Sequence, residues 1–160
     1  MAEPSAFPYQ TNVNIAFEAL SDIDVPRLVH AVTVPWYNQT LCKVNDSVVR
    51  LGVVRGEYHW HKHDEEDEFF YVVEGRFIIE LEDRTVELLP QHGFVVPKGV
   101  MHRPRAPERT VILMVEGAGI VPTEDQLRAD ERSDYLYASA SSHVSSPRVH
   151  DTFGVRSTHG

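Results

Sequence analysis

A succession of short apolar runs separated by turns is the feature that most constrains the fold of this chain. Runs rich in valine, isoleucine, leucine and aromatic residues recur at 28–34, 41–44, 47–55, 57–61, 69–73, 76–81, 85–89, 94–96 and 109–115. Pieces rich in glycine, proline, asparagine and aspartate separate them, and no long helical pattern intervenes. Many short strands at nearly regular spacing predict an all-β sandwich or small barrel.

Some of these runs are apolar on both faces of a strand. In residues 69–73, Phe70 and Val72 share one face, whereas Phe69, Tyr71 and Val73 share the other. A strand with two apolar faces must be covered on both sides, by the core and by a second sheet or subunit. The pattern therefore favours a homodimer. Trp60 is expected to pack between sheets or between subunits.

The chain has 160 residues, which fits one domain with a tail better than two domains. Residues 1–12 are predicted to form a flexible N-terminal arm, 13–137 a single domain and 138–160 a Ser-rich flexible tail. Residues 13–20 fit either a short helix or an entering strand. The sequence Thr123-Glu124-Asp125-Gln126 has the spacing of a capping box and predicts a helix that ends near Asp134.

The charge balance excludes several classes of partner. Fifteen Lys and Arg residues against 24 Asp and Glu residues give a net charge of −9. Nucleic acids and anionic membranes both require a basic surface, so neither is expected as a partner. No apolar run approaches the ~18 residues of a membrane span. The N-terminus lacks signal-peptide features, and the single cysteine, Cys42, cannot form an internal disulfide. These features predict a cytoplasmic protein.

Five of the nine histidines lie between His59 and His102, and two of them are spaced to act together. Side chains at i and i+2 of a strand project from one face, so His61 and His63 point the same way. Glu68 shares parity with the apolar residues expected in the core, where a carboxylate is costly unless it is paired or bound to a metal. The alternative is an exposed strand whose histidines face solvent beside the acidic turn 64–67.

Two motifs in this region resemble those of the cupin superfamily. The first motif ends in HxH, a glutamate and a glycine, and the second runs from a glycine through PxG to a histidine. The matching residues are His61, His63, Glu68 and Gly75 in the first motif, and Gly93, Pro97, Gly99 and His102 in the second. The detailed pattern is similar to small single-domain type-2 cupins of the mannose-6-phosphate-isomerase-like, or RmlC-like, kind.

The chain departs from the superfamily pattern at three positions. Gly56 stands five rather than six residues before His61, Gly93 lies four residues before Pro97, and Ala106 replaces a terminal asparagine. None of these departures removes a metal ligand. They affect instead the expected geometry of the loops near the mouth of the barrel.

The resemblance implies a jelly-roll β-barrel with short terminal helical pieces and one divalent transition metal per chain. Its ligands would be His61, His63, Glu68 and His102. Strand parity supports the first three, whereas only the resemblance places His102 beside them. Three imidazoles and one carboxylate suit Mn, Fe, Co, Ni or Zn. They leave one or two coordination positions for water or substrate.

Other side chains near these motifs are weaker candidates. His59 and Glu57 share parity with His61, so they either face the cavity as a catalytic base or lie beyond the rim in solvent. Arg50 and Arg55 either bind a substrate carboxylate or phosphate or are exposed strand residues. The remaining candidates for substrate contact, which core packing would equally explain, are Phe70, Phe77 and Met101.

The expected function is that of a metal-dependent enzyme of the isomerase or lyase type. Its substrate would be a small polar, oxygen-bearing metabolite such as a sugar derivative, on which the metal acts without redox change. Two alternatives stay open, because fold does not determine function in so broad a superfamily. One is an iron-dependent dioxygenase, and the other is a non-catalytic cupin that binds a sugar or another metabolite.

Overall fold

A computed structural model describes residues 9–120 of the chain, which are mostly β-strand. The elements are β1 (Gln10–Asn12), α1 (Val25–Ala31), β2 (Trp36–Val44), β3 (Ser47–Glu57), β4 (Glu68–Glu74), β5 (Phe77–Leu81), β6 (Thr85–Leu88), β7 (Gly93–Val96) and β8 (His102–Gly117). The predicted all-β class is confirmed. The predicted helix from residue 123 and the predicted tail at 138–160 lie outside the described residues.

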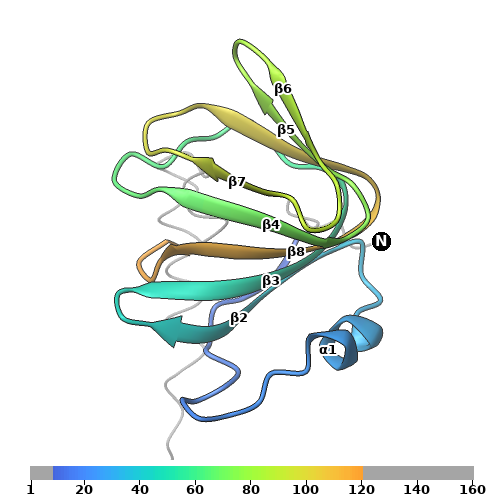
Figure 1. The fold of residues 1–160 in the computed structure, drawn as a ribbon, viewed down its shortest axis with the longest axis vertical. Coiled ribbons are helices and arrows are strands. Elements are labelled where there is room, and N and C mark those ends of the chain that lie inside the picture. Colours follow the sequence, from blue (N-terminus) through green and yellow to red (C-terminus); the bar gives the residue numbers. More distant parts are fainter. Residues whose placement is uncertain (1–8, 121–160) are drawn as a thin grey trace, which may run out of the picture. The chain divides into compact units, whose positions relative to one another are not determined.

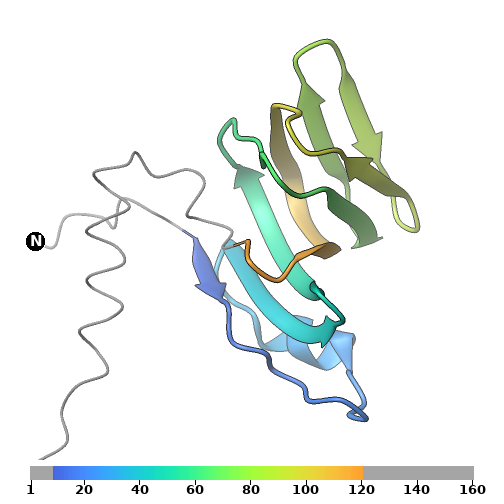
Figure 2. The same cartoon turned by 90° about the vertical axis from the view of Figure 1, so that its left-hand side faces the viewer.

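The longest strand, β8, organises the sheet by pairing with three others. The main path of paired strands runs β1-β2-β3-β8-β4-β7, and β5 pairs with β6 and with β8. The first residues of β8 pair with β5, as in Leu81 with His102, and its later residues pair with both β3 and β4. Figure 1 shows the β5–β6 hairpin at the top and β2 near the bottom, with β4, β8 and β3 between them, and Figure 2 shows the same arrangement from the side. The strands form a jelly roll.

The interior of the jelly roll is filled by alternate residues from its strands. Phe70 and Val72 of β4 point inward, as their parity predicted, with 2% and 0% of their surface exposed. The other buried members of this cluster are Trp36, Val54, Tyr58, Phe77, Ile79, Leu88, Val96, Ala106, Ile112 and Met114. Glu68 has the same parity as Phe70, so its side chain also points into this interior.

A second buried cluster covers the outer face of β2, β3 and β8. Val29 of α1 packs there with Leu41, Leu51, Val53 and Val111. Figure 1 shows α1 beside β2. The second apolar face of these strands is thus covered by a segment of the same chain. The sequence predicted that strands with two apolar faces are covered on both sides. Residues 17–32 of the same chain provide part of this cover.

The helix α1 corrects the prediction of a strand at residues 28–34. Asp24 caps it, because its Oδ1 accepts a hydrogen bond from the Arg27 amide at 3.1 Å. Pro26 stands in the first turn, where backbone N–H groups have no partner within the helix, so the N–H that proline lacks costs no hydrogen bond. Residues 13–20 form neither the short helix nor the strand that their pattern allowed.

Three further predictions at element boundaries need correction. Residues 10–12, expected within the flexible arm, form β1 and pair in parallel with β2. The run 57–61 is not a strand, because β3 ends at Glu57. Trp60 does not pack between sheets: it is 44% exposed, with the Arg103 guanidinium 5.6 Å from its ring centre. Among residues 9–120, no helix is long and apolar enough to cross a membrane.

Candidate metal centre

The segment between β3 and β4 carries His61 and His63 and is fastened to β8 by backbone hydrogen bonds. The His61 amide donates to the His102 carbonyl at 3.0 Å, and the His102 amide donates to the His61 carbonyl at 2.9 Å. The Gly99 amide donates to the His63 carbonyl at 2.7 Å. These three bonds bring the two predicted motifs into register.

Backbone carbonyls orient two of the three imidazoles. Nδ1 of His61 lies 3.0 Å from the His59 carbonyl oxygen, and Nδ1 of His102 lies 3.0 Å from the Val100 carbonyl oxygen. A carbonyl only accepts hydrogen bonds, so each Nδ1 carries the proton and each Nε2 presents a lone pair. This arrangement of a metal-binding histidine is common, because the bond at Nδ1 fixes both the tautomer and the ring orientation.

The four predicted ligands come together in the structure. The donor atoms of His61, His63, Glu68 and His102 all lie within 4.8 Å of one another, and all four residues are buried. The Glu68 carboxylate lies 3.2 Å from His63 Nε2 and 3.3 Å from His102 Nε2. Ligands about 2.1 Å from a shared ion stand roughly 3 to 4.2 Å apart, so the cluster is close to the size that a transition metal requires.

His102 carries the clearest sign that a cation belongs here. Its side chain is 0% exposed, and its Nε2 makes no hydrogen bond within residues 9–120. With the proton on Nδ1, the Nε2 lone pair faces the Glu68 carboxylate at 3.3 Å. Two electron-rich acceptors at this distance repel unless a proton or a metal cation lies between them; without a metal, a proton on the imidazoles of His102 and His63 stabilises the Glu68 carboxylate. The donor set therefore fits a divalent metal ion.

The protonation states also suit metal binding. Burial, helped by the charge of His102, lowers the pKa of His61 to about 3, so its imidazole is neutral at neutral pH. Burial alone would raise the pKa of Glu68, but the imidazoles of His102 and His63 outweigh it and hold the pKa at about 2. A metal requires neutral imidazoles and ionised carboxylates, and these two ligands are in those states at neutral pH.

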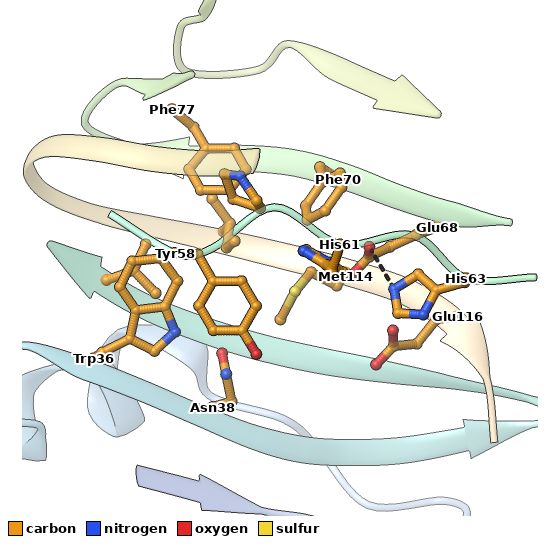
Figure 3. A pocket seen from close by; sticks show the side chains of 13 residues that line it. Trp36, Asn38, Tyr58, His61, His63, Glu68, Phe70, Phe77, Met114 and Glu116 are labelled. Carbon is orange, nitrogen blue, oxygen red and sulfur yellow. Dashed lines mark hydrogen bonds and ion pairs between the residues drawn. The ribbon is translucent and has the colours of Figure 1, made fainter. Parts of the chain in front are cut away.

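A narrow cavity of about 40 Å³ adjoins three of the four ligands, His61, His63 and Glu68. Figure 3 shows them at one side of it, with aromatic and aliphatic side chains around the rest. The apolar wall consists of Val54, Phe70, Phe77, Pro104, Ile112 and Met114. Polar groups enter from Trp36, Asn38, Tyr58 and Glu116. A cavity of this volume holds about three waters or one small molecule without rearrangement.

Glu116 is a buried acid next to this centre. Its carboxylate pairs with Arg50, whose guanidinium also donates to the Thr40 hydroxyl and the Ile120 carbonyl. Burial raises the pKa of Glu116 to about 8, and the nearby Glu68 carboxylate adds to the rise, while Arg50 opposes it. A divalent cation at Glu68 would remove one cause of this rise, because it would cancel that negative charge.

The structure separates the candidate arginines from the cavity. Arg50 is buried, but its guanidinium is engaged by Glu116, Thr40 and Ile120 and does not line the cavity. Arg55 is exposed and borders a different surface pocket. Of the apolar candidates, Phe70 and Phe77 line the cavity as expected, whereas Met101 is half-buried and does not.

The end of β3 overturns the parity argument for His59 and Glu57. β3 ends at Glu57 and residues 58–60 are not strand, so the parity of His61 does not carry back across them. Tyr58 shares parity with Val54 and, like Val54, faces the cavity, whereas Glu57 does not. Glu57 is exposed, with Arg103 at 3.7 Å. His59 is half-buried, stacks on Tyr58 with ring centres 4.4 Å apart, and is not in the cavity lining.

Four polar residues of the cavity did not appear among the predicted site residues: Trp36, Asn38, Tyr58 and Glu116. Strand parity was a usable signal for three of them. Asn38 shares parity with buried Trp36, and Glu116 shares parity with buried Ile112 and Met114. Tyr58 likewise shares parity with buried Val54.

Comparisons with known proteins agree with this architecture. The Cupin_2 family model, described as a cupin domain, matches residues 48–116. The uncharacterized protein YdbB of Bacillus subtilis is 45% identical over 80 residues, which are 49% of this chain and 71% of YdbB. A crystal structure of a cupin-2 domain containing protein from Shewanella frigidimarina is 33% identical, with a TM-score of 0.57, over 59% of this chain and 93% of that chain.

A more distant solved structure supports the fold alone. Protein NMB1881 from Neisseria meningitidis is 24% identical, with a TM-score of 0.55, over 61% of this chain and 99% of that one. The fold, the two motifs and the similarity to YdbB and to the Shewanella protein agree. The chain belongs to the cupin superfamily, as a small cupin with a Cupin_2 domain.

Proposed function

We propose that this cupin is a metal-dependent enzyme that binds one divalent transition metal at His61, His63, Glu68 and His102 and acts without redox change on a small oxygen-bearing metabolite. The observation that carries the proposal is the buried Nε2 of His102, which faces the Glu68 carboxylate at 3.3 Å without a hydrogen bond. When bound, the metal would polarise substrate oxygens as a Lewis acid.

The side chains around the centre supply the remaining requirements of isomerase or lyase chemistry. The apolar wall formed by Phe70, Phe77 and Ile112 keeps bulk water away from the bound substrate. Glu116 is the one acidic side chain, apart from the metal ligand Glu68, that lines the cavity within the described residues. A proton-transfer step needs such a group within hydrogen-bond reach of the substrate, so Glu116 takes the role that parity had suggested for His59.

Metal analysis tests the first half of the proposal. Protein purified without added metal should contain about one transition-metal ion per chain. The variant His63→Ala should lose most of the bound metal, because three protein ligands hold the ion less tightly than four. His92→Ala is the matched control, since His92 is exposed in the turn before β7. Equal metal content in the two variants would refute the site.

Metal exchange tests the second half. If the ion only polarises oxygens, Zn²⁺, Mn²⁺ and Ni²⁺ should each support turnover of hydroxy-carbonyl substrates, with graded rates. Activity that requires iron and consumes O₂ would favour a dioxygenase instead. Tight binding of a metabolite without turnover, under air and with each metal, would favour a non-catalytic binding protein.

A further inference from the structure

Trp36, at the start of β2, carries a buried hydrogen-bond donor that has no acceptor. Its side chain lines the cavity, and only 6% of the residue is exposed. Its Nε1 makes no hydrogen bond within residues 9–120. A buried indole N–H usually has an acceptor, because an unpaired donor has lost its bonds to water and gained none in return. We therefore expect the acceptor to belong to a molecule that occupies the cavity.

Aromatic neighbours hold the Trp36 ring in place. The Tyr58 ring stacks on it, with ring centres 5.2 Å apart and planes 12° apart. The Tyr9 ring meets it at 69°, with ring centres 5.4 Å apart. The indole could turn toward another acceptor only by giving up these contacts, and packed side chains have few alternative rotamers. The position of Nε1 is thus a consequence of the packing.

The end of the cavity at Trp36 is polar, and it lies away from the candidate metal centre. Figure 3 shows Trp36 on the opposite side of the cavity from His63 and Glu68, with its indole nitrogen toward Tyr58 and Asn38. Asn38 has the same parity as Trp36 in β2 and also lines the cavity. A ligand that extends from the metal to this end therefore meets polar groups at both of its own ends.

We propose that Trp36 determines ligand specificity by donating a hydrogen bond from its Nε1–H to an acceptor oxygen of the ligand. An indole N–H only donates, so the ligand must carry an acceptor at this end, such as a keto oxygen. The ligand is thus a small compound with two oxygen functions, one that binds the metal and one that accepts from Trp36. This inference rests on the proposed function, because the metal holds the other end of the same ligand.

Two pairs of carboxylates serve as probes that differ in this acceptor alone. Levulinate (4-oxopentanoate) and 5-oxohexanoate carry a keto oxygen remote from the carboxylate that would bind the metal, whereas pentanoate and hexanoate lack it. NMR of ¹⁵N-labelled, Zn²⁺-loaded protein follows the indole N–H signals of Trp36 and Trp60, the two tryptophans of the chain. At least one keto acid should shift the Trp36 signal more than its matching alkanoate does, because a new hydrogen bond forms at the indole proton. The signal of Trp60, which is 44% exposed and does not line the cavity, should stay in place.

Trp36→Phe separates the hydrogen bond from the packing. The phenylalanine keeps an aromatic ring against Tyr58 but lacks the N–H. The variant should bind the keto acid about fivefold more weakly, which corresponds to one neutral hydrogen bond, and should bind the alkanoate nearly as wild type does. Trp60→Phe is the matched control: it should bind both probes as wild type does, and the signal that it lacks assigns the other to Trp36.

Three results would count against the inference. Zn²⁺ uptake without a larger Trp36 shift for either keto acid would overturn it and leave the proposed metal site intact. Equal weakening of keto acid and alkanoate by Trp36→Phe would also overturn it, because the indole would then act through packing alone. Should Trp36→Phe fail to fold, the Trp36 shift in wild-type protein decides. A wild-type protein that takes up no Zn²⁺ would refute the proposed function, and this inference with it.

Discussion

The backbones of His61 and His102 exchange two hydrogen bonds, of 3.0 and 2.9 Å, across an isolated antiparallel bridge. This bridge sets the two rings with their centres 4.2 Å apart. The ligands of the candidate centre thus come from two distant parts of the chain that are held in register by main-chain bonds. A site built in this way is already organised before a metal arrives, and its geometry depends on the strands and turns around it.

Gly75, in the turn between β4 and β5, tests how firmly that framework is packed. Its φ is +85°, and a Cβ at this position would lie 2.6 Å from Thr110 Oγ1 and 2.8 Å from the Arg109 carbonyl oxygen. Gly75→Ala should therefore lower the free energy of unfolding by about 1–3 kcal/mol for the backbone conformation, and further for the collision. Urea denaturation of the purified variant measures the loss.

Gly99→Ala is the matched control for that change. Gly99 has a similar φ of +78°, but nothing lies within 4 Å of a Cβ built there. Its variant should lose only the same backbone contribution, about 1–3 kcal/mol. Equal losses in the two variants would show that the collision at Gly75 is relieved by a small shift of β8.

The buried Arg50–Glu116 pair should behave as a coupled unit. The two side chains are 3% and 2% exposed, so removing one partner leaves a buried charge uncompensated. Arg50→Met should destabilise the protein by about 3–5 kcal/mol, and the double variant Arg50→Met/Glu116→Leu should recover most of the loss. A double-mutant cycle from urea denaturation measures the coupling. Additive losses would contradict the pairing.

The metal-free protein should be most stable in mildly acidic solution. The pKa of His61 is lowered to about 3, so below its usual value of 6.5 the unfolded chain binds a proton that the folded protein does not, and stability falls with falling pH. The pKa of Glu116 is raised to about 8, so above its usual value of 4.5 the folded protein keeps a proton that the unfolded chain releases, and stability falls with rising pH. Between pH 4.5 and 6.5 the His61 and Glu116 effects on the free energy of unfolding have opposite signs, so stability changes little over that range.

Only the Glu116 effect remains between pH 6.5 and 8, where it amounts to at most about 1.4 kcal/mol per pH unit. Chelator-treated wild-type protein should lose thermal stability over this range. Glu116→Gln, which cannot titrate, should not show that decline. Melting temperatures measured at several pH values compare the two proteins, and parallel curves would count against a raised pKa at Glu116.

The outer face of β4 and β7 is where we expect a homodimer contact. Phe69 and Tyr71 are half-buried there and Val95 is 49% exposed, although α1 and its neighbours cover the adjoining strands. Light scattering at micromolar concentration should give the mass of two chains. Tyr71→Glu should give the mass of one chain with unchanged metal content, because burying a carboxylate in an apolar contact is unfavourable. A monomeric wild-type protein would overturn this prediction.

Local periodicity in the sequence was enough to predict much of this protein. Alternation of apolar residues predicted the strands and the inward face of β4. The spacing of His61 and His63 predicted that these two share a face, and the parity of Glu68 with Phe70 predicted that it faces the core. These inferences hold because the period of two along a strand is a local property of the backbone. The prediction missed the helix α1, although Asp24 and Pro26 are typical of a helix start. A short apolar run such as this one fits a helix and a strand equally well.

Pairing between distant segments decided the rest. The residues themselves did not place His102 beside the other ligands, since its position depends on the bridge to His61. β3 ends at Glu57, which breaks the parity between Glu57 and His61, so that Tyr58 faces the cavity and Glu57 does not. The pairing of β3 with β8 brought Arg50 to Glu116. Such outcomes depend on the balance of hydrogen bonds and packing over whole strands, and parity cannot be carried across a segment that leaves the strand conformation. The sequence alone therefore determined the strands and most of the metal ligands, whereas the tertiary structure decided which polar groups face the cavity.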